Sequence, residues 1–334
     1  MRSLVCGYLL LTLGVLAGER TVIINDEEGR RLAGAEVEAI LAPAEDPRLS
    51  SVVVRAGVTD AAGRFRFEAD DALILTRVRA KQAGHFSADA DHRHGLGRPA
   101  QSAELTLTLP RMTEGVPLHY REVRLTGLPA GRRIGFDAEA ADAVAPWGKG
   151  LVRDFEFVID SQQVGWTESP EILAELRRSA DGRRMDDQEW AETYGHFRGT
   201  LRVSFPRRGD GLRTSPAFWP YGRLKMPASA PAEGYVGETT LPFDTLPGAE
   251  PSPTLTGYYL RLRSQPGVDG QPTTAHYAKI QGRIDIGPGR VTFRFYYNPR
   301  AGDRRLAFDL RNNLLRPAPS ATPEERERLQ AYEP

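Results

Sequence analysis

The side chains of this chain that could do chemistry gather in two short stretches of sequence. The first stretch is DADHRHG, which begins at Asp89 and places Asp91, His92 and His94 close together. Histidine nitrogens and carboxylate oxygens are usual ligands of zinc. If the stretch is extended, His92 and His94 point to one side and could share an ion, with Asp91 or Asp89 as a third ligand.

A solvated loop is the alternative interpretation of DADHRHG, and it is the one that we favour. Arg93 stands between the two histidines, and glycine and proline follow the stretch. A calcium loop is excluded, because it needs an oxygen ligand and then a glycine where this stretch has Arg93 and His94. We therefore predict that the protein holds neither a metal ion nor a cofactor.

The second stretch is DFEFVID, in which Asp154, Glu156 and Asp160 lie on one side of an expected strand. A row of carboxylates can bind a cation or transfer protons, so a hydrolase site is one interpretation. The other interpretation, which we favour, is the solvated face of an antiparallel sheet. The two interpretations differ in whether the carboxylates line a pocket together with a histidine from elsewhere in the chain, namely His119, His196 or His276.

Familiar catalytic signatures are missing from the sequence. It contains no His-Glu-x-x-His, no Gly-x-Ser-x-Gly and no Walker-type glycine loop. Its single cysteine, Cys6, lies in an apolar leader, so the mature chain has no thiol nucleophile. A protein without catalytic activity is therefore the better expectation.

Loop aromatic residues are the remaining candidates for ligand contact. Trp147, Trp166, Trp219 and Tyr221 lie in stretches that contain glycine or proline. Such rings can stack on the apolar faces of sugars while polar neighbours bind the hydroxyl groups. The alternative is that these rings cover the open ends of a β-sandwich, and the second explanation is the commoner one.

The amino-terminal residues predict export. One basic residue, Arg2, precedes an apolar run from Leu4 to Ala17 that ends in small residues, the layout of a secretory signal peptide over residues 1–18. The run is shorter than the roughly 20 residues of a spanning helix, so we expect no stable membrane span in the mature chain. The 44 basic and 44 acidic residues balance, which gives no reason to expect nucleic acid as a partner.

Residues 20–110 are expected to form a succession of short strands. Alternation is clearest in GAEVEAIL, in RFRFEA and in ELTLTLP, where apolar and polar residues take turns. In TDAAGRF, Asp60 can accept hydrogen bonds from the turn backbone, and Gly63 can adopt the positive φ that a tight turn needs. Phe65 and Phe67 then point to one face.

The order of these motifs resembles the carboxypeptidase regulatory-like domain. The matching stretches are an Asp-x-x-Gly turn, a Gly-Ala-x-Val strand, a Thr-Asp-x-x-Gly-x-Phe hairpin and a Lys-x-x-Gly segment, at Asp26–Gly29, Gly34–Val37, Thr59–Phe65 and Lys81–Phe86. The resemblance covers under a third of the chain. It implies a prealbumin-like antiparallel Greek-key β-sandwich that serves as a folding or contact module and brings no catalytic residues. The loop at residues 43–50 is longer than the common form of that family.

Residues 118–315 are expected to form a second β-rich domain of unknown function. Ile280, Ile284 and Ile286 predict a hairpin with the strand that follows the GPGR turn. Ser169-Pro170 predicts the start of a short helical insertion. Residues 316–334 read as a polar tail in which Thr322-Pro323 can start a short helix.

The sequence as a whole predicts a mainly β protein with two domains that is secreted or periplasmic. The expected function is non-catalytic binding or a structural role at the cell envelope, with an unknown protein or glycan as partner. A hydrolase with its site in residues 118–315 and a carbohydrate-binding protein that uses loop aromatics remain the alternatives.

Overall fold

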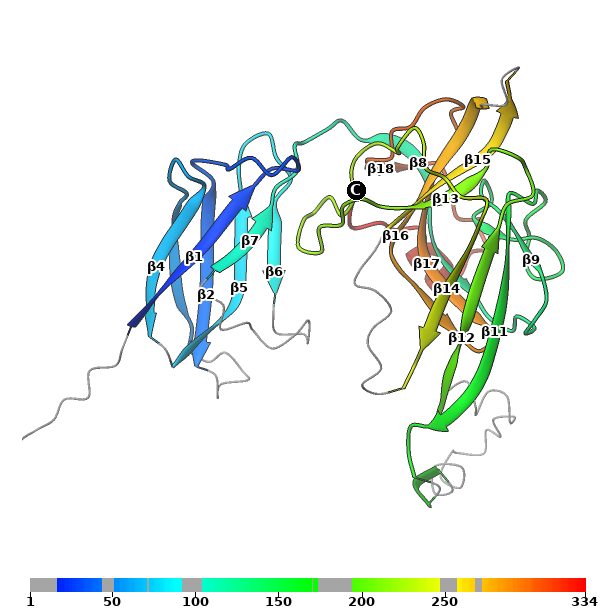
Figure 1. The fold of residues 1–334 in the computed structure, drawn as a ribbon, viewed down its shortest axis with the longest axis horizontal. Helices are drawn as coiled ribbons and strands as arrows, with labels where there is room; N and C mark the ends of the chain where they lie inside the picture. The colour runs from blue at the N-terminus through cyan, green and yellow to red at the C-terminus, as the bar shows by residue number, and fades with distance from the viewer. Residues whose placement is uncertain are drawn as a thin grey trace, which may run out of the picture. The chain divides into compact units, whose positions relative to one another are not determined.

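The regular secondary structure of the described chain is almost entirely β-strand, as the sequence predicts (Figure 1). This fold is a computed structural model, and it describes residues 17–43, 51–70, 72–91, 104–169, 171–173, 194–246, 257–267 and 272–334. Of the predicted signal peptide over residues 1–18, residues 1–16 lie outside these ranges, and Ala17 and Gly18 are described as part of a strand. His92 and His94 also lie outside these ranges.

The described chain divides into two compact units. The first unit comprises Met1–Met112 together with Tyr221–Arg223. The second unit comprises Thr113–Pro220 and Leu224–Pro334, so it includes the polar segment after residue 315 instead of leaving it as a separate tail.

Two sheets build the first unit. One has the strand order β4-β1-β7 and the other the order β3-β2-β5-β6. The bounds are β1 Ala17–Asn25, β2 Glu36–Pro43, β3 Val53–Val58, β4 Arg64–Asp70, β5 Leu73–Lys81, β6 Ala88–Asp91 and β7 Glu104–Thr108. Apolar side chains of both sheets form one core between them, which includes Val22, Val37, Phe67, Val78 and Leu107.

The pairing within this sandwich departs from the antiparallel expectation in one place. β1 pairs with β7 in parallel, with Val22 opposite Leu105, whereas its other neighbour β4 is antiparallel. The predicted turn at Asp60 and Gly63 is present, since Asp60 Oδ1 accepts the N–H groups of Ala62 and Arg64. This turn links β3 to β4, which lie in different sheets, so it is a crossing between sheets and not a hairpin.

The second unit is also built from two sheets. Their strand orders are β10-β9-β11-β12-β14 and β13-β15-β16-β17-β8-β18. The bounds are β8 Val116–Leu125, β9 Ile134–Asp137, β10 Asp142–Ala143, β11 Phe155–Trp166, β12 Gly195–Ser204, β13 Gly211–Thr214, β14 Glu238–Asp244, β15 Tyr258–Pro266, β16 Pro272–Gly287, β17 Arg290–Asn298 and β18 Phe308–Asn313. The predicted hairpin is confirmed, because Ile280 lies opposite Phe295 and Ile286 opposite Val291.

The six-stranded sheet of the second unit carries an apolar core on each face. Its inner face packs against the five-stranded sheet through residues such as Phe136, Phe157 and Phe295. Its outer face carries a second cluster that includes Tyr120, Tyr259, Tyr296 and Phe308, and Met226 and Ala331 from outside the sheet pack against it. Successive side chains of β16 and β17 point to opposite faces of the sheet, and both faces are apolar.

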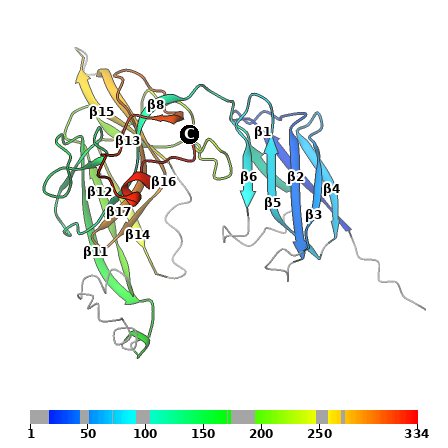
Figure 2. The ribbon, with the colours of Figure 1, turned by 180° about the vertical axis from the view of Figure 1, so that it is seen from behind.

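Helical structure is scarce in the described ranges. At the predicted helical insertion, Leu173 N donates to Ser169 O, and the following residues 174–193 lie outside the description. The predicted helix after Thr322 is confirmed as α3, Pro323–Glu327, with Thr322 as N-cap and a capping box to Glu325. Figure 2 shows α3 in red on the second unit.

Gly63 offers a test of the turn that crosses between the sheets of the first unit. Its φ is +68°, and an added Cβ would lie 2.9 Å from Ile24 O and 3.1 Å from Leu32 N. We expect Gly63→Ala to lower the free energy of unfolding of the first unit by more than about 2 kcal/mol, because strain and crowding act together. Hydrogen exchange of the β1 and β4 amides measures this change.

Gly29→Ala is the matched control for this substitution. Gly29 also has a positive φ, +81°, but an added Cβ would meet nothing within 4 Å. It should cost only the conformational strain of about 1 kcal/mol. Equal losses for the two variants would show that crowding at Gly63 has no role.

Candidate functional site

A buried ion pair joins the two sheets of the second unit. The Arg263 guanidinium, from β15, donates from Nε to Asp154 Oδ1 at 2.9 Å and from Nη2 to Asp154 Oδ2 at 3.0 Å. Asp154, directly before β11, has a fully buried side chain, and the Arg263 side chain is 18% exposed. The two-point geometry fits a guanidinium fork against a carboxylate.

A bulge in β15 turns Arg263 toward Asp154. Leu262 faces the inner core, so strict alternation would send the next side chain outward. Instead the register with β16 shifts after Leu262, and Arg263 has a φ of +52°. Asp210 holds this bulge by accepting the N–H of Arg263 at 2.9 Å and that of Ser264 at 2.8 Å. Burial raises the pKa of Asp210, although these hydrogen bonds oppose the rise.

Two more carboxylates surround the guanidinium. Glu139 Oε2 lies 2.6 Å from Arg263 Nη1, and Asp137 Oδ1 lies 3.4 Å from Arg263 Nη2. Burial would raise the pKa of Asp137, but the N–H groups of Val152, Leu151, Ala140 and Glu139 hold that pKa below its usual value. We call Asp137, Glu139, Asp154 and Arg263 the sandwich-end cluster.

Two histidines and a tyrosine lie beside the sandwich-end cluster. The Arg263 guanidinium lies 5.7 Å from the ring centre of Tyr297, whose Oη is 2.9 Å from His276 Nδ1. The His119 ring meets the Tyr297 ring edge to face, and His119 Nδ1 is 2.7 Å from Glu139 O. Burial, and then the positive charge of Arg263, lower the pKa of His276, so this imidazole favours the neutral form.

The structure therefore brings Asp154 together with His119 and His276 but separates the other predicted carboxylates from them. Glu156 is buried and bound by two other arginines, Arg133 at 3.1 Å and Arg153 at 2.6 Å. Asp160 is exposed.

The expected solvated face is thus wrong for Asp154 and Glu156. Arginine side chains neutralise both carboxylates and take them out of water. His196, the third histidine considered with the carboxylates, is buried on β12 and faces Gly165 across the strand pair.

The hydrogen bonds of the sandwich-end cluster are better suited to joining the two sheets than to catalysis. Asp154 binds Arg263 with both oxygens, and its Oδ2 also accepts the N–H of Ala138. Three hydrogen bonds and a paired cation thus engage both oxygens of this buried carboxylate, which makes it a poor acceptor for a substrate proton. None of the described cavities is lined by Asp154, Arg263 or His276.

The loop aromatics differ in exposure. Trp147 is 40% exposed and Trp166 is 43% exposed, so both rings can meet a ligand. Trp219 is half-buried, and its backbone N–H donates to Lys225 O. Tyr221 packs against the core of the first unit, so its ring contributes to packing in that sandwich.

The DADHRHG stretch is described only as far as Asp91. His92 and His94 lie outside the described residues. Asp89 and Asp91 are engaged with Arg77, at 2.5 Å and 4.0 Å, so the described part of the stretch is an ion-pair network on β5 and β6. Among the described residues, the carboxylates of Asp26, Glu27 and Glu28 could also meet at one ion, but Asp26 already binds Arg30 at 2.7 Å.

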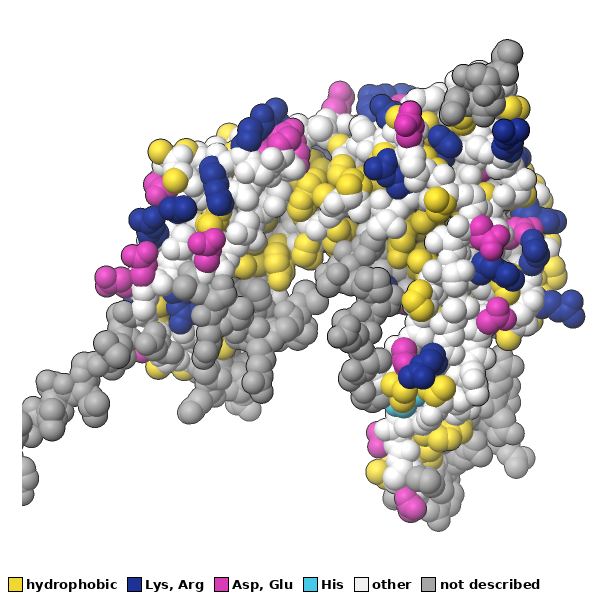
Figure 3. All heavy atoms as spheres, viewed as in Figure 1, with side chains coloured by type: hydrophobic (Ala, Val, Ile, Leu, Met, Phe, Trp, Pro, Cys, Tyr) yellow, Lys and Arg dark blue, Asp and Glu magenta, His cyan; other side chains and the backbone are white. Residues whose placement is uncertain are grey.

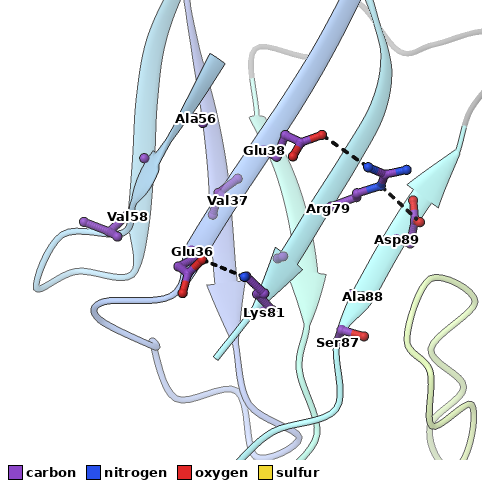
Figure 4. A pocket seen from close by; sticks show the side chains of 12 residues that line it. Glu36, Val37, Glu38, Ala56, Val58, Arg79, Lys81, Ser87, Ala88 and Asp89 are labelled. Carbon is purple, nitrogen blue, oxygen red and sulfur yellow. Dashed lines mark hydrogen bonds and ion pairs between the residues drawn. The ribbon is translucent and has the colours of Figure 1, made fainter. Parts of the chain in front are cut away.

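A groove of about 710 Å³ lies over the outer face of the sheet β3-β2-β5-β6 (Figure 4). Its floor runs from apolar residues on β3 through acidic residues on β2 and basic residues on β5 to an acidic residue on β6. Lys81 pairs with Glu36 at 2.9 Å, and Arg79 pairs with Glu38 at 3.3 Å and Asp89 at 3.5 Å. We call this surface the charged sheet face. Figure 3 shows acidic and basic side chains interspersed over the described surface in view.

The strand β3 forms an apolar rim of the groove. Val54 is 49% exposed and Val58 is 60% exposed, and both lie on the side of β3 that carries Ala56. Among the described strands β3 pairs only with β2, although the Arg55 side chain of β3 donates to Glu68 O of β4. A smaller cavity, of about 310 Å³, lies in the second unit and is lined by Arg121, Asp142 and Lys149 among others.

The site residues that sequence reasoning missed share a physical reason. In RLRSQP, Arg263 reads as an outward residue, and nothing in the stretch signals a bulge. The only usable signal for Asp137 was its place directly after the apolar strand IGF, where a carboxylate commonly binds loop N–H groups.

Arg263→Met tests whether the sandwich-end cluster joins the sheets. It leaves Asp154 buried without a cation, so we expect the free energy of unfolding of the second unit to fall by about 3–5 kcal/mol. The double variant Arg263→Met/Asp154→Leu should recover much of that loss. Urea unfolding followed by tryptophan fluorescence measures both changes.

Arg198→Gln supplies the control for the Arg263 substitution. Arg198 pairs with Asp244 at 2.7 Å, but its side chain is 63% exposed. Loss of this exposed pair should cost less than about 1 kcal/mol. A loss for Arg263→Met as small as that of the control would contradict a joining role.

Comparisons with known proteins give no family for this chain. No family model matches it, and no curated protein matches it. Among solved structures it is similar to a Bacteroides fragilis protein of unknown function described as membrane-associated, at 10% identity and a TM-score of 0.18, over 86% of this chain and 99% of that chain. A TM-score this low carries no argument. Within the described ranges, every helix is too short or too polar to cross a bilayer.

Proposed function

We propose that this chain is an exported, non-catalytic binding protein of the cell envelope. In this proposal the first unit contacts an extended segment of a partner protein along β3 and the charged sheet face. The observation that carries the proposal is the edge strand β3, with Val54 and Val58 exposed beside a groove of about 710 Å³. The resemblance to the carboxypeptidase regulatory-like domain, a contact module, agrees with it.

An exposed apolar edge strand is a ready partner for another strand. Its unpaired N–H and C=O groups can bond an added strand, and its side chains offer pockets for alternate residues of that strand. Folded proteins usually protect such an edge with charge or proline. One side of β3 presents Val54, Ala56 and Val58, whereas its single charged residue, Arg55, lies on the other side and donates to Glu68 O.

The opposite edge of the same sheet already accepts an added segment. Asp89 N donates to Tyr221 O, and Arg223 N donates to Ser87 O, each at 2.8 Å, around a bridge between Ala88 and Gly222. Residues from far along the chain therefore extend this sheet beyond β6. The same mode of pairing is available to a partner at β3.

The neutralised carboxylates support a non-catalytic role. Asp154 and Glu156 are both bound by arginines, so neither is a free base at the position where a hydrolase would need one. The hydrolase alternative would need Arg263 to leave Asp154, which exposes a buried charge without a partner.

Val54→Lys/Val58→Lys tests the role of β3, because lysine opposes strand addition at an edge. Extended peptides displayed on phage would be selected on the wild type, and their affinities then measured for each variant. We expect the double variant to bind the selected peptides at least about tenfold more weakly, a loss of about 1.4 kcal/mol. Val164→Lys/Val236→Lys, at valines 39% and 50% exposed, is the control and should bind normally.

Two results would count against this proposal. The first is the absence of any enriched peptide. The second is enriched peptides that bind the β3 variant as tightly as the wild type.

Glycan binding in the second unit is a second candidate function, and one observation favours it. Trp147 is 40% exposed on the loop after β10. That loop supplies Lys149, and β10 supplies Asp142, to the cavity of about 310 Å³. Arg121 and Arg316 line the same cavity, so cationic groups outnumber the acidic Asp142 and Glu325 there. An acidic polysaccharide is the glycan class that fits this composition.

Trp147→Ala tests the glycan candidate. Affinity electrophoresis in gels that contain an acidic polysaccharide should show retardation of the wild type that weakens at least about threefold in the variant, as expected for the loss of one stacked ring. Trp166→Ala, which removes a ring of similar exposure, is the control. Unchanged migration of the wild type in every gel would remove the candidate.

A further inference from the structure

A lysine on the outer face of the six-stranded sheet is completely buried by the residues that lie over that face. Lys279, on β16, has a relative exposure of 0%, and its Nζ lies 4.5 Å from the ring centre of Tyr296. The Nζ atom has no hydrogen-bond partner among the described residues. Burial lowers the pKa of Lys279 to about 7, so much of this amine is neutral near physiological pH.

Residues 328–334 cover Lys279 and form what we call the covering segment. Arg328 O accepts the N–H of Glu122 on β8, Tyr296 Oη on β17 donates to Glu333 O, and Ala331 packs against the outer apolar cluster. The covering segment therefore crosses strands of the sheet instead of extending it as a further strand.

Three donors from separate parts of the second unit converge on the carboxylate of Glu333. Lys225 Nζ lies 3.0 Å from Oε1, Gln281 Nε2 donates to Oε2 at 3.1 Å, and Arg294 Nη1 reaches Oε2 at 3.4 Å. Gln281 and Arg294 are direct neighbours across β16 and β17. We call Lys225, Gln281 and Arg294 the carboxylate cradle.

The covering segment leaves polar atoms below it unsatisfied. Lys279 Nζ lacks an acceptor and Gln281 Oε1 lacks a donor among the described residues, although Lys279 is 0% and Gln281 4% exposed. A buried polar atom without a partner is unfavourable, because it gives up its hydrogen bonds to water and gains none in the protein. Both atoms belong to residues of β16 that are two positions apart, so they lie close together. A third buried atom without a partner among the described residues, Arg328 Nε, belongs to the covering segment itself.

We propose that the carboxylate cradle and Lys279 form a binding site for an acidic, extended peptide segment of a partner protein, which the covering segment occupies in this structure. The carboxylate of the partner replaces that of Glu333. A peptide group that lies deeper in the site offers its C=O to Lys279 Nζ and its N–H to Gln281 Oε1. Such a ligand satisfies the two atoms that the covering segment leaves without partners.

This site is independent of β3 and of the cavity beside Trp147. It lies on β16, β17 and the loop that carries Lys225, all within the second unit. Its ligand is identified by one side-chain carboxylate and one main-chain amide, which makes an acidic peptide a better fit than a sugar or a metal ion.

The experiment measures how tightly an added peptide binds when it must replace the covering segment, in the wild type and in a variant whose covering segment is loosened. The probe is the peptide LQAYEP, labelled and capped at both ends, titrated into full-length wild type and full-length Glu333→Gln and followed by fluorescence anisotropy. Glu333→Gln loosens the covering segment, so we expect it to bind the probe at least tenfold more tightly than the wild type does. The matched peptide LQAYQP should bind Glu333→Gln at least tenfold more weakly than LQAYEP.

Further variants separate binding from unfolding and self-association. Adding Arg294→Gln to Glu333→Gln should abolish probe binding, while thermal melts show that each variant still folds. Selection of displayed peptides on Glu333→Gln should enrich an acidic residue at one fixed position. Equal binding of the two peptides would overturn the proposal. Dimerisation of Glu333→Gln that competes with the probe would also overturn it, because the occupant would then be a second copy of this chain.

Discussion

The six-stranded sheet of the second unit is apolar on both faces, so it must be covered on both sides. The five-stranded sheet covers the inner face, and chain segments outside the sheets cover the outer face. This requirement explains why residues 316–334, polar in composition, belong to the second unit. Charged side chains between the six-stranded sheet and the segments that cover it are removed from water. Their hydrogen-bond and ion-pair partners therefore determine how costly their burial is.

Two buried basic side chains in this unit differ in whether a carboxylate accompanies them. Arg263 meets Asp154 with two hydrogen bonds and has further carboxylates nearby, so its charge is fully compensated. Lys279 has an aromatic ring beside it but no hydrogen-bond acceptor in the described structure. A compensated buried pair serves to join two sheets, whereas an uncompensated group under a short covering segment is suited to a ligand that supplies what is missing.

The sequence predicted what depends on alternation and local turn chemistry. The mainly β fold, the hairpin around Ile286, the turn at Asp60 and the cap at Thr322 all follow from neighbours within a few residues. The sandwich-end cluster did not, because Arg263 reaches Asp154 across 109 positions and through a bulge that alternation cannot signal. Lys279 was missed for a related reason: a charged residue in an alternating strand indicates a solvated face unless another segment is known to cover it.

The same reasoning bears on the choice between binding and catalysis. A hydrolase needs a base whose lone pair faces a cavity, and the described carboxylates closest to histidines are instead turned into an arginine. The Lys279 amine and the Gln281 amide oxygen lack hydrogen-bond partners among the described residues. Several valines and tryptophans are exposed on the surface. Such groups are of the kinds that bind main chain, apolar side chains and sugar faces. The chemistry of these surfaces therefore supports the proposal of a binding protein, with proposed sites in both units.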